Sequence, residues 1–138
     1  MIDDNKTLVR RYYEEVLNDR DLDVVPELFA PAFVSYAPSG RSVDLGDYVR
    51  AIGVSHAALP DLHVTIEDQF AEGDRVVTRW SATGTQQGPF AGIAPTGKAI
   101  TVTAMHIHRI ADGKLAEHWE QFDLYGLLRQ LGVLPTPG

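Results

Sequence analysis

The chain has 138 residues, a formal net charge of −7 and no cysteine. The length predicts one domain, residues 1–138, that can bury a core without disulfide bonds, and the lack of cysteine excludes thiol chemistry. The acidic balance argues against nucleic acid or an anionic membrane surface as a partner, and no apolar run is long enough to span a bilayer.

The N-terminal part of the chain predicts a long helix. The opening segment, MIDDNKTLVRRYYEE, is charged and lacks the apolar centre of a signal peptide, so we expect a soluble, cytoplasmic protein. Asp3 and Asp4 are suited to cap a helix that runs to about Asn18, and its apolar residues form one stripe at helical spacing. The stripe contains both Tyr12 and Tyr13 and does not decide which of them faces a pocket.

Two further helices are expected before the sheet. A short helix spans residues 22–29, with Pro26 tolerable only near its first turn. Residues 33–40, FVSYAPSG, predict a short strand that ends in a loop. The third helix spans residues 45–59. Its inner side carries Tyr48, Val49, Ile52, His56 and Leu59.

From residue 62 onward the pattern is that of antiparallel strands. Residues 62–88 alternate between apolar and polar and contain a turn at residues 72–74, whereas residues 89–101 have too many turn formers for a regular element. Residues 101–123 predict a hairpin, and residues 124–138 a short apolar helix or turn followed by a tail. Helices followed by a meander predict an α+β fold, in which a curved antiparallel sheet, wrapped by the three N-terminal helices, encloses a cone-shaped hollow.

The faces of the hairpin depend on the length of its turn at residues 111–113. A two-residue type I′ loop would put His106 and Glu120 on opposite faces, because a one-residue slip reverses a whole strand. A three-residue turn with Gly113 in a G1 bulge puts them on the same face and pairs His106 with His118. We favour the three-residue turn. It gathers on one face Ala104, His106, His108, His118, Glu120 and Phe122.

A strand face with three imidazoles and a carboxylate has three interpretations. It can be the solvated side of an antiparallel sheet. It can line a hollow, where desolvation raises the pKa of the carboxylate and an imidazole donates to a substrate oxygen. It can also hold zinc or iron, since the spacing of His106 and His108 puts both rings on one side of the strand.

Four segments carry a family resemblance that covers nearly the whole chain. They are LVRRYYEEVLNDRDLDVVPELFAPAFV (8–34), PDLHVTIED (60–68), AEGDRVVTRWSATGTQQGPFAGIAPTGKAI (71–100) and IHRIADGKLAEHWEQFD (107–123). With them the chain resembles the SnoaL-like polyketide cyclase and ester cyclase family of the NTF2-like superfamily. The resemblance implies a cone-shaped barrel around a mostly apolar pocket, a homodimer packed sheet to sheet, and no metal or other cofactor.

The resemblance also implies roles for single residues. In such cyclases an acid/base aspartate follows the tryptophan of the last strand, and that position is Glu120 here, one methylene longer. A histidine on the preceding strand assists the aspartate and matches His106. In the more distant ketosteroid isomerases, the oxyanion-binding tyrosine of the first helix falls on Tyr13. Their proton-shuttling aspartate falls on Ala37, which argues against steroid-type isomerisation.

We therefore predict a cofactor-independent enzyme of lyase or isomerase type that cyclises a small, apolar or polyketide-like carbonyl compound by an intramolecular aldol reaction. Glu120 would take and return a proton, and His106 with Tyr13 would stabilise the enolate oxygen. A non-catalytic module that binds small molecules and an epoxide hydrolase or isomerase of the same superfamily remain alternatives. The expected pocket wall consists of His118, His108, Tyr36, Tyr48, Ile52, Trp80, Phe90 and Phe122.

Overall fold

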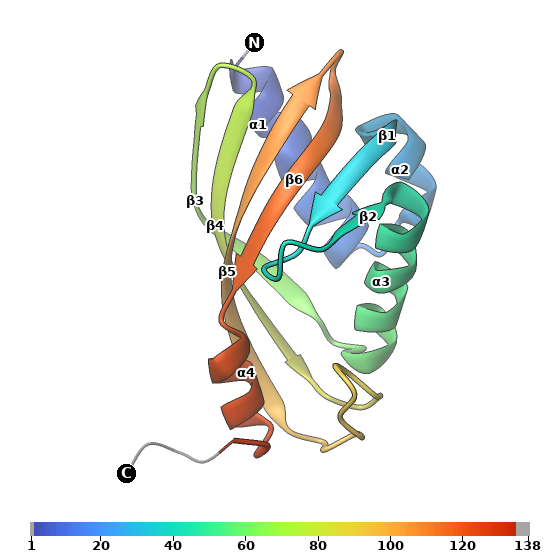
Figure 1. The fold of residues 1–138 in the computed structure, drawn as a ribbon, viewed down its shortest axis with the longest axis vertical. Coiled ribbons are helices and arrows are strands. Elements are labelled where there is room, and N and C mark those ends of the chain that lie inside the picture. Colours follow the sequence, from blue (N-terminus) through green and yellow to red (C-terminus); the bar gives the residue numbers. More distant parts are fainter. Residues whose placement is uncertain (1, 135–138) are drawn as a thin grey trace.

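A computed structural model describes residues 2–134 and shows one curved six-stranded sheet with helices packed on its inner face (Figure 1). The strands, in the order β2-β1-β6-β5-β4-β3, are β1 (Phe29–Tyr36), β2 (Ser42–Asp44), β3 (His63–Glu72), β4 (Arg75–Thr85), β5 (Ala99–Ala111) and β6 (Lys114–Phe122). β1 runs parallel to β6, and the other neighbouring pairs run antiparallel. The predicted α+β arrangement is confirmed.

The helical segments agree with the predicted ranges but differ in type. They are α1 (Ile2–Arg11), the π-helical η1 (Tyr12–Asn18), the 3-10 helix η2 (Leu22–Val24), α2 (Val25–Leu28), α3 (Leu45–Ala58) and α4 (Leu124–Gln130). Pro26 lies in the first turn of α2, as expected. Asp3 and Asp4 lie within the first turn of α1 instead of capping it. The end of the predicted C-terminal tail, residues 135–138, is outside the described range.

The first helix changes from α to π geometry where it crosses the sheet. The change begins at Tyr12, and the widened turn buries the adjacent residues Tyr12 and Tyr13 almost completely, at 1% and 0% exposure. η1 contacts β3, and α1 contacts β3, β4 and β6. The two tyrosines therefore enter the space between the helix and the inner face of the sheet together.

The third helix closes the other side of that space. Asp44 caps it by accepting a hydrogen bond from the backbone N–H of Asp47, and its buried face carries Ile52 and His56. At its other end the guanidinium of Arg20 donates to the backbone oxygen of His56, which ties the C-terminal turn of α3 to the segment after η1. α3 therefore faces η1 across the hollow side of the sheet.

The segment between β4 and β5 is irregular up to residue 98, as predicted, and β5 begins at Ala99. The buried side-chain amide of Gln86 holds this segment together. It donates to the backbone oxygens of Gly88 and Ile93 and accepts from Thr96. Within residues 2–134, no helix is both long and apolar enough to cross a membrane.

The prediction of a three-residue turn between β5 and β6 is wrong. The turn consists of Asp112 and Gly113, whose φ angles of 52° and 75° are those of a type I′ turn. Ala111 pairs with Lys114, as this two-residue loop requires. If the pairing continued regularly, Glu120 would face away from the hollow.

A β-bulge in β6 reverses that consequence. Ala116 is an extra residue without a partner on β5, because the pairing register shifts by one residue beside it. Beyond the bulge the predicted division of the two faces is correct. The partners differ from the prediction, since His106 pairs with Glu120 and His108 with His118. With a two-residue turn, His106 and Glu120 therefore share the inward face because the bulge takes up one residue of β6.

Deleting Ala116 is expected to remove the bulge and to leave the inward face of β6 unchanged. Without the extra residue, Leu115 and Glu117 become neighbours and can keep their partners Ile110 and Arg109, so Glu120 still pairs with His106. Urea unfolding followed by circular dichroism measures the effect, and the deletion variant should still unfold in one cooperative transition. The matched variant Ala116→Ser keeps the residue count and is expected to stay within about 1 kcal/mol of wild type. A deletion variant that no longer folds would show that the bulge does more than accommodate one extra residue.

Candidate functional site

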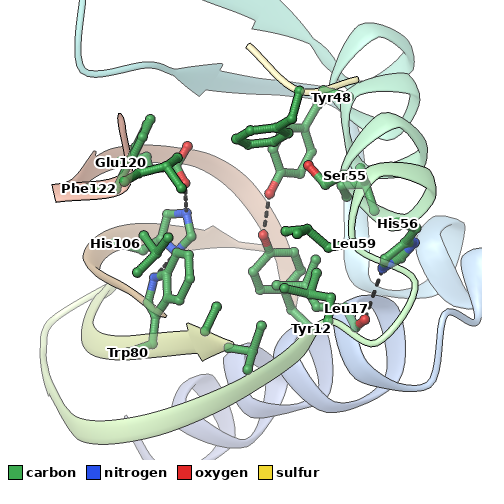
Figure 2. Close-up of a pocket in the computed structure, with 18 residues that line it drawn as sticks. Tyr12, Leu17, Tyr48, Ser55, His56, Leu59, Trp80, His106, Glu120 and Phe122 are labelled. Carbon is green, nitrogen blue, oxygen red and sulfur yellow. Dashed lines mark hydrogen bonds and ion pairs between the residues drawn. The ribbon is translucent and has the colours of Figure 1, made fainter. Parts of the chain in front are cut away.

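A cavity of about 240 Å³ lies between the inner face of the sheet and the helices η1 and α3 (Figure 2). Its wall is mainly apolar, and Glu120 is the charged side chain among the lining residues of the described chain. The lining residues are Tyr12, Leu17, Tyr48, Ala51, Ile52, Ser55, His56, Leu59, Leu62, Val64, Trp80, Ala82, Phe90, Val102, His106, Glu120, Phe122 and Leu127.

The structure brings most of the predicted site residues to this cavity. Glu120 and His106 line it, as do five of the expected wall residues: Tyr48, Ile52, Trp80, Phe90 and Phe122. The register of the sheet explains the common position of the strand residues, and helical spacing explains that of Tyr48 and Ile52 on α3. Phe90 reaches the cavity from the irregular segment between β4 and β5.

Three predicted wall positions are wrong. His108 and His118 are fully buried further toward the hairpin turn, where the ring of Tyr12 packs against both. Tyr36 lies on the outer face of the sheet, because it pairs with Trp119, and stacks on that ring at 5.5 Å. Side chains alternate along a strand, so a residue paired with Trp119 cannot share the face of Glu120.

The open choice between the two tyrosines of η1 is decided by the geometry. Tyr12 lines the cavity, and its hydroxyl forms a hydrogen bond with that of Tyr48. Tyr13 lies behind His106, with its hydroxyl 2.7 Å from the Nδ1 atom of that ring. The predicted direct contact between Tyr13 and a substrate oxygen is therefore not supported by its position.

Glu120 is a carboxylic acid in an apolar setting. Its Oε1 lies 3.6 Å from Nε2 of His106, and 26% of its side chain is exposed. Burial raises the pKa of Glu120 to about 7. Near neutral pH the group can therefore exist in both the charged and the protonated form, as a general base that also returns a proton requires.

His106 is held in one neutral form by its neighbours. The indole N–H of Trp80, which can only donate, lies 2.8 Å from Nδ1, so the ring proton resides on Nε2 (Figure 2). Burial, and then the proximity of His118 and His108, lowers the pKa of His106 well below its usual value. Nε2 has no hydrogen-bond partner among residues 2–134, since Glu120 at 3.6 Å is too far. This N–H is a donor that lacks an acceptor.

The three inward histidines form a buried cluster with ring centroids 4.6–5.0 Å apart. Nδ1 of His118 lies 3.2 Å from Nε2 of His108, and Nε2 of His118 lies 2.7 Å from the hydroxyl of Ser35. Burial lowers the pKa of each ring. Nε2 of His106 and Nδ1 of His108 have no hydrogen-bond partner in the described chain. No group of three or more potential ligands in residues 2–134 is arranged to hold a metal ion.

Several lining residues were not predicted as site residues. Ser55 lies seven positions after Tyr48 and three after Ile52 on α3, so helical spacing alone could have placed it beside them. His56 was considered an inward residue; its Nε2 donates to the backbone oxygen of Leu17 at 2.9 Å. Two lining residues, Leu62 just before β3 and Val64 within it, gave no sequence signal beyond alternation.

Comparison with known proteins gives consistent relationships. The family model described as SnoaL-like polyketide cyclase matches residues 7–131. The chain is similar to the nogalonic acid methyl ester cyclase of Streptomyces nogalater, with 30% identity over 83% of this chain and 84% of that protein. It is also similar to the aklanonic acid methyl ester cyclase DnrD of Streptomyces peucetius, with 27% identity over 94% and 92% of the two chains.

Solved structures share the fold as well. AclR from Streptomyces galilaeus, described as a candidate hydroxylase, matches with a TM-score of 0.89 and 32% identity, over 99% of this chain and 89% of that one. IdmH from Streptomyces antibioticus, described as a candidate polyketide cyclase, matches with a TM-score of 0.83 and 32% identity, over 94% and 99%. The same cone-shaped architecture thus occurs in proteins with different described activities.

The histidine cluster predicts an acid-sensitive fold. Below pH 6.5 the unfolded chain protonates its histidines, while His106, His108 and His118 resist protonation in the fold, so the free energy of unfolding falls as the pH falls. Glu120 opposes one of these three protons between its ordinary pKa of 4.5 and about 7. These four groups together are expected to give a slope of roughly 2.7 kcal/mol per pH unit, and His56, whose pKa is also lowered by burial, adds to it.

The variant His108→Gln should reduce that slope by about 1.4 kcal/mol per pH unit, since one buried imidazole is gone. Urea unfolding between pH 5 and pH 8, as a series of matched titrations, measures it. His63→Gln, on an exposed histidine of β3, is the control and should leave the slope unchanged. Equal slopes in the two variants would show that the cluster does not resist protonation.

Proposed function

Because the chain belongs to the SnoaL-like polyketide cyclase family, we propose that it closes a ring in a small, largely apolar polyketide carbonyl compound by an intramolecular aldol addition. The observation that carries this proposal is that Glu120 lies next to His106 at the wall of an apolar cavity. The pKa of Glu120 is raised to about 7, and the Nε2–H of His106 has no hydrogen-bond acceptor among residues 2–134. These are a base and an oxyanion donor placed next to each other.

The reaction balances with protons alone. The carboxylate of Glu120 takes a proton from a carbon next to a carbonyl group, which leaves an enolate. The enolate carbon then attacks a second carbonyl carbon of the same molecule, forming one C–C bond and an alkoxide. The alkoxide receives the proton held by Glu120. The product is an isomer of the substrate, and Glu120 returns to its starting state.

His106 supplies the donor in this scheme. An enolate oxygen that enters beside the carboxylate would give Nε2–H the acceptor that it lacks. Trp80 and Tyr13 act as positioning residues, because both contact Nδ1 on the far side of the ring. Because the pKa of His106 is low, its neutral imidazole donates a hydrogen bond to the enolate oxygen and does not compete with Glu120 for the substrate proton.

Three alternatives are less well supported. In a domain with a purely structural role, side chains would occupy the interior. Here a cavity of about 240 Å³ remains beside Glu120. Epoxide opening by an aspartate–arginine–aspartate set lacks its residues, since neither aspartate nor arginine occurs among the lining residues of the described chain. Hydroxylation, the activity described for AclR, is supported by one structural relative, whereas the family model and the curated relatives are described as cyclases; the two reactions differ in product mass, because hydroxylation adds an oxygen atom.

Replacing Glu120 by glutamine is expected to lower kcat at least about 100-fold, because the amide cannot take a proton. The purified protein is incubated with nogalonic acid methyl ester and with aklanonic acid methyl ester, the compounds named for the relatives. Chromatography with mass detection follows the appearance of an isomer. For the wild type, kcat/KM should rise with pH and level off above about 7, since Glu120 must be ionised.

Gln121→Glu, on the outward-facing neighbour, is the matched control and should keep wild-type turnover, since its side chain is exposed. Undiminished turnover by Glu120→Gln would remove Glu120 from the mechanism. A product heavier by one oxygen would replace cyclisation by hydroxylation. No conversion of either ester, with both recovered unbound, would refute the assignment of this substrate class.

We also propose that the protein forms a homodimer through the outer face of its sheet. One row of paired residues crosses five strands on that face, and we call it the outer row. It consists of Phe70, Val77, Ile107, Trp119 and Tyr36. Phe70 and Ile107 are 61% and 37% exposed. A continuous apolar row on an exposed sheet face is typical of a surface that a partner covers.

The variant Ile107→Glu, at the centre of the outer row, is expected to dissociate the dimer because it would bury a charge in the interface. Sedimentation equilibrium of wild type and variant measures the mass. Val54→Glu, on an exposed position of α3, is the control and should leave the mass unchanged. A monomeric wild type, or a dimer that survives Ile107→Glu, would contradict the proposed interface.

A further inference from the structure

The cavity contains a second polar feature, formed by the hydroxyls of Tyr12 and Tyr48. Figure 2 shows them turned toward each other from η1 and α3, while Glu120 and His106 project from the sheet. The two hydroxyls are hydrogen-bonded to each other, and both residues line the cavity. Neither the proton transfer proposed above nor the donor to the enolate uses this pair.

One of the two O–H groups in this pair has no hydrogen-bond acceptor in the described chain. Each phenol has one O–H to donate, and one of the two is used in the bond between them. In residues 2–134 neither hydroxyl makes any other hydrogen bond, so the second O–H has no protein acceptor. The surrounding lining is mostly apolar, including Ile52 and Leu59. An O–H without an acceptor in such a setting costs free energy until a ligand oxygen supplies one.

Burial indicates which hydroxyl is free. Tyr12 is 1% exposed and enclosed by other rings, whereas Tyr48 is half-buried. Because Tyr12 is the more enclosed residue, its O–H has the hydroxyl of Tyr48 as its acceptor, and donation along that bond leaves the O–H of Tyr48 for the cavity. Burial also raises the pKa of both phenols well above the usual value, so both stay protonated donors.

We infer that the Tyr12–Tyr48 pair is a second oxygen-binding position, which takes a carbonyl or phenolic oxygen of the substrate remote from the reacting carbons. This inference rests on the proposed function, and it defines the substrate class further. The substrate would carry one oxygen function at Glu120 and His106 and another at the tyrosine pair, on a compact ring skeleton between them. Compounds with a single oxygen function would bind at one end only.

The probes are α-tetralone, a bicyclic ketone with one oxygen, and its isomeric derivatives with one added phenolic hydroxyl. For the wild-type protein, at least one hydroxytetralone should bind roughly 3- to 10-fold more tightly than α-tetralone, the gain of one neutral hydrogen bond. In the double variant Y12F/Y48F the gain should disappear, so that α-tetralone and the hydroxytetralones bind with Kd values within about twofold of one another. Titration calorimetry or ligand-observed NMR gives the Kd values.

Single variants sharpen the test. Tyr48→Phe frees the O–H of Tyr12 to reach the ligand, so it should retain part of the gain that the double variant loses. Tyr125→Phe, on an exposed tyrosine of α4 outside the cavity, should retain all of it. Circular dichroism and thermal unfolding verify that Y12F/Y48F is folded.

Two results would overturn the inference. The first is a wild type that binds no hydroxytetralone more tightly than α-tetralone, including a wild type that binds none of them. The second is a gain that survives in Y12F/Y48F. Both are measured as affinities without turnover, so they are independent of the outcome for Glu120→Gln. A failed cyclase assay with an intact tyrosine-dependent gain would refute the reaction and leave the binding position in place.

Discussion

One hydrogen bond, from the indole N–H of Trp80 to Nδ1 of His106, determines the chemical state of the site. An indole nitrogen cannot accept, so this contact fixes the imidazole tautomer and opposes its protonation. The proton on Nε2 is thereby directed to the side of the ring where Glu120 lies. A neutral imidazole leaves the carboxylate without a cationic partner. The pKa of Glu120 consequently follows its desolvation and rises toward neutrality.

The buried histidines beside the cavity, His106, His108 and His118, lower the stability of the fold in acid. His108 and His118 satisfy one another and Ser35, but Nδ1 of His108 has no partner in the described chain. The three imidazole rings pack against Tyr12 and make one side of the cavity's surroundings densely packed and uncharged. This packing comes at the expense of acid stability, since each ring must stay neutral while buried. A site that holds a carboxylate near its point of half-ionisation needs such an uncharged surrounding.

Relatives of this fold are described as cyclases and, for AclR, as a candidate hydroxylase. The architecture supplies the cavity, while single side chains decide the reaction. In this chain Glu120, the single tautomer of His106 and the Tyr12–Tyr48 pair are the side chains on which the proposed proton transfer and the proposed recognition of two oxygen functions depend. The longer carboxylate arm of Glu120 lies opposite His106 in the sheet pairing and reaches the same cavity.

The sequence by itself predicted the element order and, with the family resemblance, two sheet residues that line the cavity, His106 and Glu120. Its division of the hairpin faces agrees with the structure beyond the bulge, although the turn from which it was derived was wrong. Alternation on β5 placed His106 and His108 on one face, and the family resemblance pointed to Glu120. Only the tertiary structure decided how β6 reaches that arrangement. Asp112-Gly113 is a local signal for a type I′ turn, but no local signal marked the bulge at Ala116. The division of labour between Tyr12 and Tyr13 likewise depended on π-helical geometry, which a stripe at α-helical spacing does not reveal. The tautomer of His106 was beyond any pattern, since Trp80 meets it across β4 and β5 through long-range packing.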